Sequence, residues 1–176
     1  MSDLLSFCTI QTPLGNMCCG VFNDKLVLLE FENETRVADQ LKQLANHLNA
    51  RPVPEETSLS RKVQEQLNEY FDQKRRSFDL QLLMVGSKFQ EKVWESLFDI
   101  PYGRTTSYQQ QAIKYGDVKA IRAVAKANGE NRIGIVIPCH RVIGSDGSLT
   151  GYAGELWRKK ALLELEGAFA KQASLF

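Results

Sequence analysis

The chain has 176 residues and a net charge of +1, and its hydrophobic and charged fractions, 43% and 24%, are ordinary for a soluble protein with one large core or two small ones. Its longest apolar runs are far shorter than a membrane span, and Met1-Ser2-Asp3 lacks the basic stretch of a signal peptide. These features argue against a membrane protein and predict a cytoplasmic one.

The cysteines and histidines are too few and too scattered for a structural metal site. They show neither the spacing of a zinc ribbon nor the density of a secreted disulfide scaffold. We therefore expect reduced thiols, no metal and no other cofactor. The residues concerned are Cys8, Cys18, Cys19, Cys139, His47 and His140.

The small net charge hides an asymmetry between the two halves of the chain. Residues 1–85 contain 9 basic and 12 acidic side chains, whereas residues 86–176 contain 13 basic and 9 acidic ones. Between Arg104 and Arg141 there are seven basic residues and two acidic ones. This excess suits a polyanion, but it is also common on a solvated surface, so charge alone leaves both interpretations open.

The first third of the chain predicts a small antiparallel sheet followed by helices. Apolar residues at helical spacing predict a helix over 37–48, which Arg51-Pro52-Val53-Pro54 ends because a residue before proline avoids the α conformation. A second helix is expected from just after Ser60 to about Gln73. The expected strands cover 5–10, 17–22 and 25–31, with turns at 12–16 and 23–24.

The pattern changes near Gly86, where we place a domain boundary. Just before it, alternating apolar and polar residues predict a half-buried strand over 78–82. After it, helices dominate. We therefore predict an α+β protein with an N-terminal α/β domain, residues 1–86, and a mostly helical C-terminal domain, residues 87–176.

Two short helices in the second domain suggest a helix-turn-helix. Ser87-x-x-Gln90 and Ser107-x-x-Gln110 are capping-box signatures, and Asp117 can cap a helix from Val118 to about Asn128 that Gly129 closes. A tight glycine-containing turn between two helices is typical of the motif. Any helical hairpin would fit the same pattern.

Cys139 lies between an apolar stretch, Ile135-Val136-Ile137, expected to be a strand, and a polar turn that contains His140 and Arg141. A thiolate is a far better nucleophile than a thiol, and a neighbouring imidazole and positive charge both favour it. The sequence therefore makes Cys139 a candidate nucleophile. Taken alone, an isolated cysteine is more often a small buried hydrophobe.

Residues 138–142, Pro-Cys-His-Arg-Val, resemble the active-site signature of the O6-alkylguanine-DNA alkyltransferases. Further segments match this family in the right order and cover essentially all of residues 87–167; the first 86 residues match more loosely. The segments are Ser107-Tyr108-Gln109-Gln110, Arg122-Ala123-Val124, Asn131, Gly151-Tyr152-Ala153-Gly154, Leu163-Glu164-Leu165-Glu166-Gly167 and, in the first domain, Thr12-Pro13-Leu14-Gly15 and Phe78-Asp79-Leu80.

Two positions depart from the family pattern. Arg132 follows Asn131 where most relatives have proline, which is expected to loosen the turn that holds Asn131. Asn23 and Leu28 occupy two places of the zinc ligands of the human-type member. This second departure supports the expectation that the chain holds no metal.

The resemblance implies a monomeric DNA-repair protein in which Cys139 irreversibly takes the alkyl group from O6-alkylguanine, with O4-alkylthymine as a further candidate substrate. It also implies a ribonuclease-H-like first domain and a winged-helix-like second one. His140 would act through a bound water as the base and Glu166 would orient it, as in a hydrolase triad. Asn131 would tie the turn before the cysteine. Tyr108 would hydrogen-bond the guanine, and Tyr152, Val142, Ala153 and Lys159 would surround it.

A guanine O6 in a duplex is beyond reach of a buried thiol, so the nucleotide must rotate out of the stack. By resemblance, the helix over 118–128 enters the minor groove of double-stranded DNA, Arg122 fills the gap, and Ala123 and Lys126 contact the DNA. By composition alone, this is simply a good helix, both tyrosines could be core residues, and Glu166 could be a surface carboxylate.

Three other functions compete with this interpretation. An alkyltransferase-like protein that senses the lesion without repair is disfavoured because Cys139 is present. A cysteine hydrolase is disfavoured because Cys139 and His140 are adjacent and no oxyanion-hole motif is recognisable. A transcriptional regulator would bind a specific sequence regardless of damage.

The last five residues, Gln172-Ala173-Ser174-Leu175-Phe176, resemble the short peptide by which bacterial replication and repair proteins bind the sliding clamp. Leu175 and Phe176 would enter an apolar pocket and Gln172 would make a polar contact. The alternative is a frayed end whose apolar residues fold back onto the protein.

Overall fold

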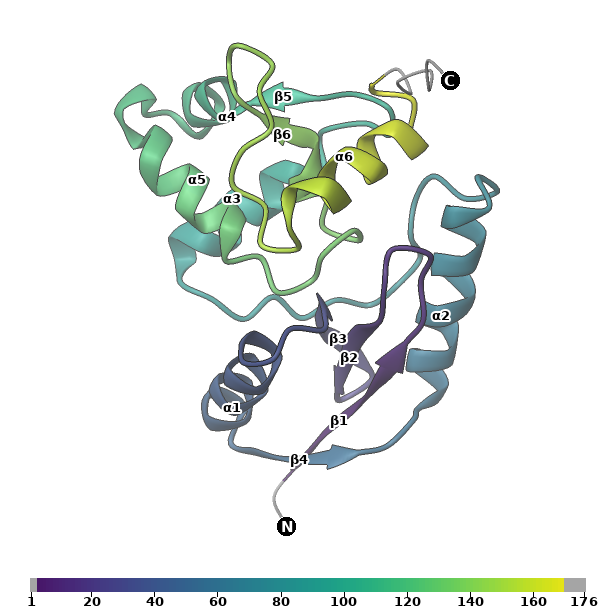
Figure 1. Cartoon of the computed structure of the whole chain (residues 1–176). Coiled ribbons are helices and arrows are strands. Elements are labelled where there is room, and N and C mark those ends of the chain that lie inside the picture. Colours follow the sequence, from purple (N-terminus) through teal and green to yellow (C-terminus); the bar gives the residue numbers. More distant parts are fainter. Residues whose placement is uncertain (1–2, 170–176) are drawn as a thin grey trace. The chain divides into compact units, whose positions relative to one another are not determined.

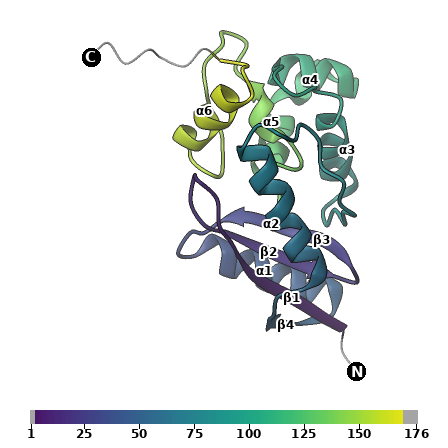
Figure 2. The ribbon, with the colours of Figure 1, turned by 90° about the vertical axis from the view of Figure 1, so that its right-hand side faces the viewer.

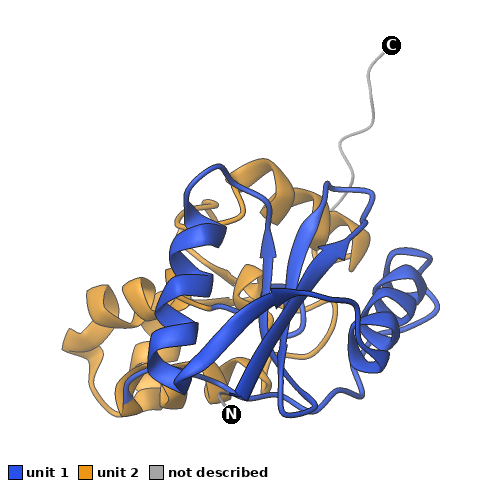
Figure 3. Ribbon diagram, turned by 90° about the horizontal axis from the view of Figure 1, so that it is seen from below, with its two compact units in different colours: residues 1–87, 132–136 blue, residues 88–131, 137–176 orange. Residues whose placement is uncertain are grey.

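The computed structural model describes residues 3–169, and the chain forms two compact units (Figure 3). Unit 1 comprises residues 1–87 and 132–136, and unit 2 comprises residues 88–131 and 137–176. The predicted domains, 1–86 and 87–176, stay a prediction; they did not include the return of residues 132–136 to unit 1. Within residues 3–169, no helix has both the length and the apolar character needed to cross a bilayer.

Unit 1 is built on a four-stranded sheet with strand order β3-β2-β1-β4 (Figure 1). Neighbouring strands are antiparallel except β4, which is parallel to β1. Two helices, α1 (Arg36–Leu48) and α2 (Ser58–Phe71), cover opposite faces of this sheet (Figure 2). The strands are β1 (Asp3–Ile10), β2 (Met17–Phe22), β3 (Lys25–Phe31) and β4 (Ala50–Pro54).

The sequence of β3 explains why the sheet is covered on both faces. Residues 26–29 of this strand, Leu-Val-Leu-Leu, are fully buried, so successive side chains on both faces are apolar. Both helices are amphipathic and turn their apolar sides to the sheet. The three antiparallel strands were predicted from segments bounded by turns, and α1 was predicted from the helical spacing of its apolar residues.

Residues 51–54 were expected only to end α1, but they belong to strand β4. Its position at the edge of the sheet accommodates Pro52 and Pro54, because an edge strand has a row of N–H groups that need no ladder partner. Helix α2 begins at Ser58, earlier than expected, because Thr57 and Ser60 form a capping box.

The strand expected over 78–82 is wrong. Only Leu82 makes a bridge, to Leu26 of β3. At Asp79 the backbone bonds to a side chain instead: Asp79 N donates to Gln66 Oε1 (2.9 Å), and Gln66 Nε2 donates to Asp79 O (3.0 Å). The Gln66 side chain therefore bonds the backbone N–H and C=O of Asp79, which in a strand would bond to the neighbouring strand.

Unit 2 is mostly helical, with one short parallel strand pair, β5 (Thr106–Ser107) and β6 (Val142–Ile143). Together with unit 1 this makes the protein a mixed α+β fold, as predicted. The helical elements are α3 (Lys88–Leu97), α4 (Tyr108–Tyr115), η1 (Val118–Ala120), α5 (Ile121–Gly129), η2 (Cys139–Arg141) and α6 (Leu156–Leu165), where η marks a 3₁₀ helix.

Helices α4 and α5 are the two short helices that the capping signatures predict, and their assignment as a helix-turn-helix stays a prediction. The Ser107 capping box is present, and Gly116 adopts the left-handed conformation that ends α4. The helix expected from Val118 begins instead as 3₁₀ turn η1, where the Asp117 carboxylate accepts from Lys119 N. Inside the pair, Asn128 Nδ2 donates to Gln111 Oε1 (2.6 Å) and Gln111 Nε2 donates back to Asn128 Oδ1 (3.2 Å), which fixes the two helices against each other.

Residues 132–136 pair with the edge of β3 in unit 1. Leu29 N donates to Arg132 O and Gly134 N donates to Leu29 O, each at 2.8 Å. The Arg132 guanidinium donates to Val85 O (3.3 Å) and to Gln43 Oε1 (3.1 Å), so this residue, which was expected to loosen the turn, has contacts that hold it.

The strand expected over 135–137 is wrong, because the chain turns there twice. Val136 N donates to Gly134 O (2.7 Å), Cys139 N donates to Ile137 O (2.8 Å), and Ile135 has a φ of 67°, a left-handed value that strains a β-branched residue. The apolar run is nonetheless buried throughout. Burial, and not strand structure, accounts for its composition.

Candidate active site

Cys139 begins the 3₁₀ turn η2, and its side chain is almost completely buried. Asn131 Nδ2 donates to the Cys139 sulfur at 3.3 Å and to Ile137 O at 2.9 Å. Residues 132–136 belong to unit 1, so Asn131 and Ile137 are the residues of unit 2 on either side of this segment. The Asn131 amide joins these two residues next to the thiol. The structure therefore brings Asn131 and Cys139 together, as the resemblance implies.

His140 and Glu166 form a fully buried pair, with Nε2 of the imidazole 2.8 Å from Oε1 of the carboxylate. Burial lowers the pKa of His140. Burial also raises the pKa of Glu166, but hydrogen bonds and charges from His140 and Arg141 outweigh it and lower that pKa to about 2. A neutral imidazole facing a carboxylate must donate from Nε2, which leaves the Nδ1 lone pair available as a base.

Arg141 holds the other side of the same carboxylate. Its Nε donates to Glu166 Oε2 (2.9 Å) and its Nη2 to Glu166 Oε1 (3.0 Å), while Nη1 donates to Ile100 O (2.7 Å). The charge of Arg141 was expected to favour the thiolate of Cys139. Its donors are instead directed to the carboxylate and a carbonyl, so Arg141 orients Glu166.

Gly103 allows the chain to pass close to this cluster. It has a φ of 78°, and a Cβ at this position would lie 2.9 Å from Glu166 O. Its N–H is 3.5 Å from Glu166 Oε2. Sequence reasoning missed Gly103 and Ile100 as parts of the site and gave Arg141 a different role. The glycine in the Pro101-Tyr102-Gly103 turn was the signal that could have indicated a close approach.

Tyr108, at the start of α4, and Lys159, in α6, meet beside the cysteine. Lys159 is completely buried, and its Nζ donates to Tyr108 Oη (3.2 Å) and to Thr150 O (2.8 Å). Tyr108 Oη in turn donates to Thr150 O (2.9 Å). Burial lowers the pKa of Lys159 to about 8, whereas the charge of Cys139 raises it. Burial raises the pKa of Tyr108, and so does the charge of Cys139.

The other predicted pocket residues differ in exposure. Val142 is fully buried, Tyr152 is half-buried, and Ala153 is exposed. Gly151, with a φ of 63°, would place a Cβ 3.4 Å from Tyr108 Oη, so the loop that contains Tyr152 approaches the tyrosine of α4. Sequence reasoning did not identify Thr150, which contributes only a backbone oxygen.

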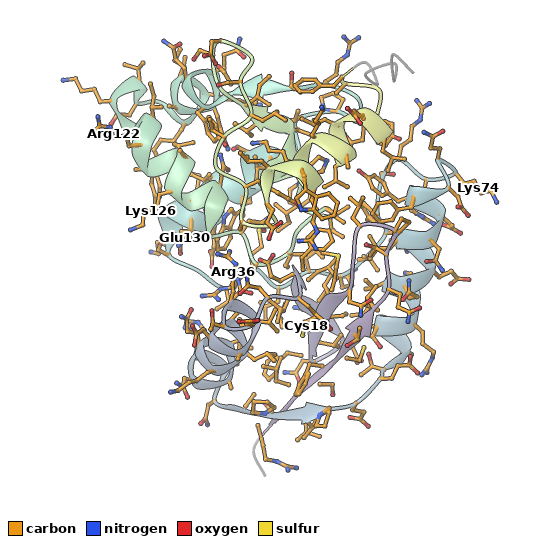
Figure 4. All side chains as sticks on the ribbon, viewed as in Figure 1. Cys18, Arg36, Lys74, Arg122, Lys126 and Glu130 are labelled. Atoms are coloured by element: carbon orange, nitrogen blue, oxygen red, sulfur yellow. The ribbon has the colours of Figure 1, made fainter. Side chains whose placement is uncertain are left out.

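The residues predicted to contact DNA lie on one exposed side of α5. Arg122, Ala123 and Lys126 are all exposed, and Arg122 extends away from the helix (Figure 4). Lys126 Nζ is 3.9 Å from Glu130 Oε1 one turn later, a contact worth little at a surface. These side chains do not take part in the cluster around Cys139.

No group of three or more His, Cys, Asp or Glu side chains within residues 3–169 is arranged to hold a metal ion. The expectation of no metal and no cofactor stays a prediction. His140 and Arg141 share Glu166 as their acceptor.

Comparisons with known proteins identify relatives of this chain. The model of the 6-O-methylguanine DNA methyltransferase DNA-binding domain matches residues 88–168. The methylated-DNA–protein-cysteine methyltransferase of Mycobacterium tuberculosis is 40% identical over 163 residues, 93% of each chain, and that of Mycobacterium leprae is 46% identical over 158 residues, 90% of each. The constitutive methyltransferase of Bacillus subtilis is 40% identical over 89% of this chain and 92% of its own.

Solved structures are similar over the whole chain. The O6-methylguanine methyltransferase of Mycobacterium tuberculosis has a TM-score of 0.80 at 38% identity and covers 97% of both chains. The same protein in complex with DNA has a TM-score of 0.79 at 38% identity and covers 93% of this chain and 94% of its own. This chain therefore belongs to the 6-O-methylguanine DNA methyltransferase family.

Proposed function

We propose that this chain repairs DNA by transferring the alkyl group of O6-alkylguanine to the sulfur of Cys139. The thiolate attacks the alkyl carbon, the bond from that carbon to O6 breaks, and its electron pair stays with the purine. The proton lost by the thiol ends on the guanine, so cysteine and alkylguanine become S-alkylcysteine and guanine with no co-reactant. Since the thioether is not cleaved, each molecule acts once.

The observation that carries this proposal is that Cys139 directly precedes His140, whose buried ring is joined to Glu166 and, through it, to Arg141. His140 accepts the thiol proton through an intervening water, and Glu166 orients the ring and stabilises the imidazolium. In support, Nε2 of His140 is hydrogen-bonded to Glu166, and Nδ1 has no hydrogen-bond partner among the described residues. Nδ1 is thus the atom suited to take the proton.

Tyr108 and Lys159 are placed to act on the departing guanine. Both lie close enough to Cys139 for its charge to affect their pKa values. We assign Tyr108 to hydrogen-bond the base and Lys159 to hold the tyrosine hydroxyl and offset developing negative charge. Tyr152 packs on the flipped base, and Val142 and Ala153 complete the pocket. O4-alkylthymine has the same leaving oxygen and is the second candidate substrate.

For DNA binding we assign α5 to the minor groove. Arg122 fills the place of the rotated nucleotide, while Ala123 and Lys126 lie against the strands. Their exposure on one side of the helix supports this assignment. The finer fold descriptions, ribonuclease-H-like for the first domain and winged-helix-like for the second, belong to the same proposal, as do a monomeric state and a cytoplasmic location.

The decisive experiment uses a duplex that contains O6-methylguanine with a labelled methyl group. Mass spectrometry should find one added methyl on the peptide that contains Cys139. Cys139→Ala should abolish transfer but leave lesion binding measurable, since the sulfur contributes little contact surface. Loss of lesion binding together with transfer would mean that Cys139 is structural, and a methyl on another residue would refute the assignment.

The assignment of Arg122 has its own test. Arg122→Ala should slow repair of the duplex by roughly tenfold or more and leave the reaction with free O6-benzylguanine unchanged, because only the duplex requires base rotation. Lys119→Ala, a neighbouring exposed charge, is the matched control. Equal losses on both substrates would show that Arg122 is not the residue that replaces the base.

The proposed contact with a sliding clamp concerns residues 172–176, which lie outside the described residues. Its support is the sequence alone: Gln172, Leu175 and Phe176 match a clamp-binding peptide. Titration of the clamp from the source organism with the full chain and with a chain ending at residue 171 tests it. Indistinguishable affinities would refute the contact and leave the repair proposal untouched.

A further inference from the structure

Unit 1 contains three cysteines that the repair reaction does not use. Cys8 of β1 and Cys19 of β2 are directly opposite each other in the antiparallel strand pair. Cys18 (Figure 4) is opposite Thr9 and packs in the core cluster with residues of α1. Because successive side chains of a strand point to opposite faces, Cys8 and Cys19 share one face of the sheet and Cys18 is on the other.

The two thiols are within reach of each other without any change of register. Opposed residues of an antiparallel pair have Cα atoms about 4.5 to 5.5 Å apart, inside the range of about 4.4 to 6.8 Å that disulfides require. Cys8 and Cys19 also lie close enough together for each thiol to shift the pKa of the other. A bond between these sulfurs is therefore geometrically accessible from the reduced state.

The surroundings give the two thiols different roles. Cys19 is fully buried, whereas Cys8 is half-buried and lines an open cavity of about 970 Å³. The pKa of Cys8 is lowered to about 6, chiefly by hydrogen bonding with Cys19 and also with Ser60 of α2. Burial and the charge of Glu56 raise this pKa but do not outweigh the hydrogen bonds. The same hydrogen bond raises the pKa of Cys19. Cys8 is thus the attacking sulfur, and Cys19 keeps its proton.

We propose that Cys8 and Cys19 form a peroxide-sensitive site that closes to a disulfide, separate from the repair cysteine. The Cys8 thiolate attacks one peroxide oxygen, the O–O bond breaks, and the released hydroxide leaves as water after taking up a proton. The Cys19 sulfur then attacks the sulfenic sulfur of Cys8, and the S–O bond breaks. The second hydroxide takes the Cys19 proton, so two thiols and one hydrogen peroxide become a disulfide and two waters.

The charge of the cavity favours this intramolecular outcome. Its charged lining residues are all carboxylates: Glu32, Glu34, Glu55 and Glu56. They repel anionic thiols such as glutathione but have no such effect on uncharged hydrogen peroxide. Cys19, already in contact with Cys8, is therefore favoured over a thiol from solution as the partner of the oxidised sulfur.

The test uses the Cys18→Ser/Cys139→Ser chain, in which Cys8 and Cys19 are the two remaining thiols. After treatment with hydrogen peroxide near pH 7, both thiols should disappear together, the intact mass should fall by about 2 Da, and dithiothreitol should restore both. In the Cys18→Ser chain, which keeps Cys139, cyanogen bromide cleavage after Met17 separates Cys8 from Cys19, and the two fragments should stay joined until reduction. In the unmodified chain the fragment after Met17 contains both Cys18 and Cys19, so the same cleavage there checks, independently of the variants' folding, that Cys8 forms the bond.

Two further variants in the same background assign the roles. With Cys19→Ser, no disulfide forms and dimedone traps a sulfenic acid on Cys8; with Cys8→Ser, Cys19 reacts at least about tenfold more slowly. The proposal is wrong if Cys8 and Cys19 both remain free thiols in the Cys18→Ser/Cys139→Ser chain after peroxide treatment, while the same treatment oxidises Cys18 or Cys139 in the unmodified chain. A disulfide that joins Cys8 to Cys18 would also overturn it.

Discussion

Each unit contains one buried carboxylate paired with arginine, and the two behave in opposite ways. In unit 1, Glu30 accepts from Arg36 Nε (3.2 Å) and from Phe31 N (3.2 Å), and a third of the Arg36 side chain is exposed. Burial raises the pKa of Glu30 despite these contacts. In unit 2, Glu166 accepts two hydrogen bonds from the buried Arg141 guanidinium and one from the His140 imidazole, and its pKa is lowered to about 2.

The comparison shows that burial alone does not decide the charge of a carboxylate. What differs is the burial of the charged or ionisable donors: His140 and Arg141 are buried beside Glu166, whereas Arg36 beside Glu30 is partly solvated. Several close donors to the ionised form can outweigh the cost of desolvation. An ionised Glu166 is what the proposed role of His140 requires, so the difference connects the packing of unit 2 to its chemistry.

The largest effect is expected from Glu166→Ala. It leaves His140 and Arg141 buried without their acceptor, which should lower the free energy of unfolding by about 3 to 5 kcal/mol and nearly abolish alkyl transfer. Urea denaturation and single-turnover repair measure the two effects. The control is Glu164→Ala, whose side chain only pairs with Lys160 one turn away, at 3.9 Å; it should change stability by less than about 0.5 kcal/mol. Equal losses in the two variants would contradict the central role of Glu166.

The second effect is the acid dependence of stability. The pKa of Glu166 is about 2 when folded and 4.5 in its ordinary state, so its contribution is fully present above about pH 4.5 and is lost as pH falls toward 2. A shift of this size corresponds to about 3 kcal/mol. His140 acts in the same direction below its ordinary pKa of 6.5, since burial lowers its folded value.

Urea denaturation at a series of pH values measures this acid dependence. Glu166→Gln should flatten the part of the profile below pH 4.5, because an amide does not titrate in this range. A Glu166→Gln profile parallel to that of the unmodified chain would show that other groups cause the acid loss.

The third effect concerns rate. His140→Gln keeps a polar side chain of similar size but removes the base, so transfer at pH 7 should slow by about a hundredfold. The deficit should shrink as pH rises toward the ordinary thiol pKa of about 8.5, because the thiolate then forms without help. Single-turnover repair from pH 6.5 to 9 checks this. A deficit that is constant across this range would remove His140 from the role of base.

The comparison also separates what the sequence could predict from what it could not. Periodicity identified α1, turn residues delimited β3, and capping residues identified α4 and α5, because all three signals are properties of the local sequence. The family motif identified Cys139, His140 and Glu166, and the structure brings the last two into contact. Gly103 and the role of Arg141 were missed because both depend on Glu166, 63 and 25 residues away. The strand expected over 78–82 failed for a similar reason, since Gln66 in α2 takes the backbone hydrogen bonds of Asp79.

The smallest effect, and the sharpest contrast with Glu166, is expected from Glu30→Gln. Because burial raises the pKa of Glu30, its folded state favours the proton, and ionisation at neutral pH costs stability. The amide avoids that cost and still accepts from Arg36, so the free energy of unfolding at pH 7 should change by less than about 1 kcal/mol in either direction. As pH rises through the raised pKa of Glu30, the free energy of unfolding of the unmodified chain should therefore fall to or below that of Glu30→Gln. Urea denaturation at pH 4, 5.5 and 7 measures the difference. If Glu30→Gln lowered the free energy of unfolding by about 3 kcal/mol or more, as expected for Glu166→Ala, the partly solvated Arg36 would be shown to stabilise an ionised Glu30.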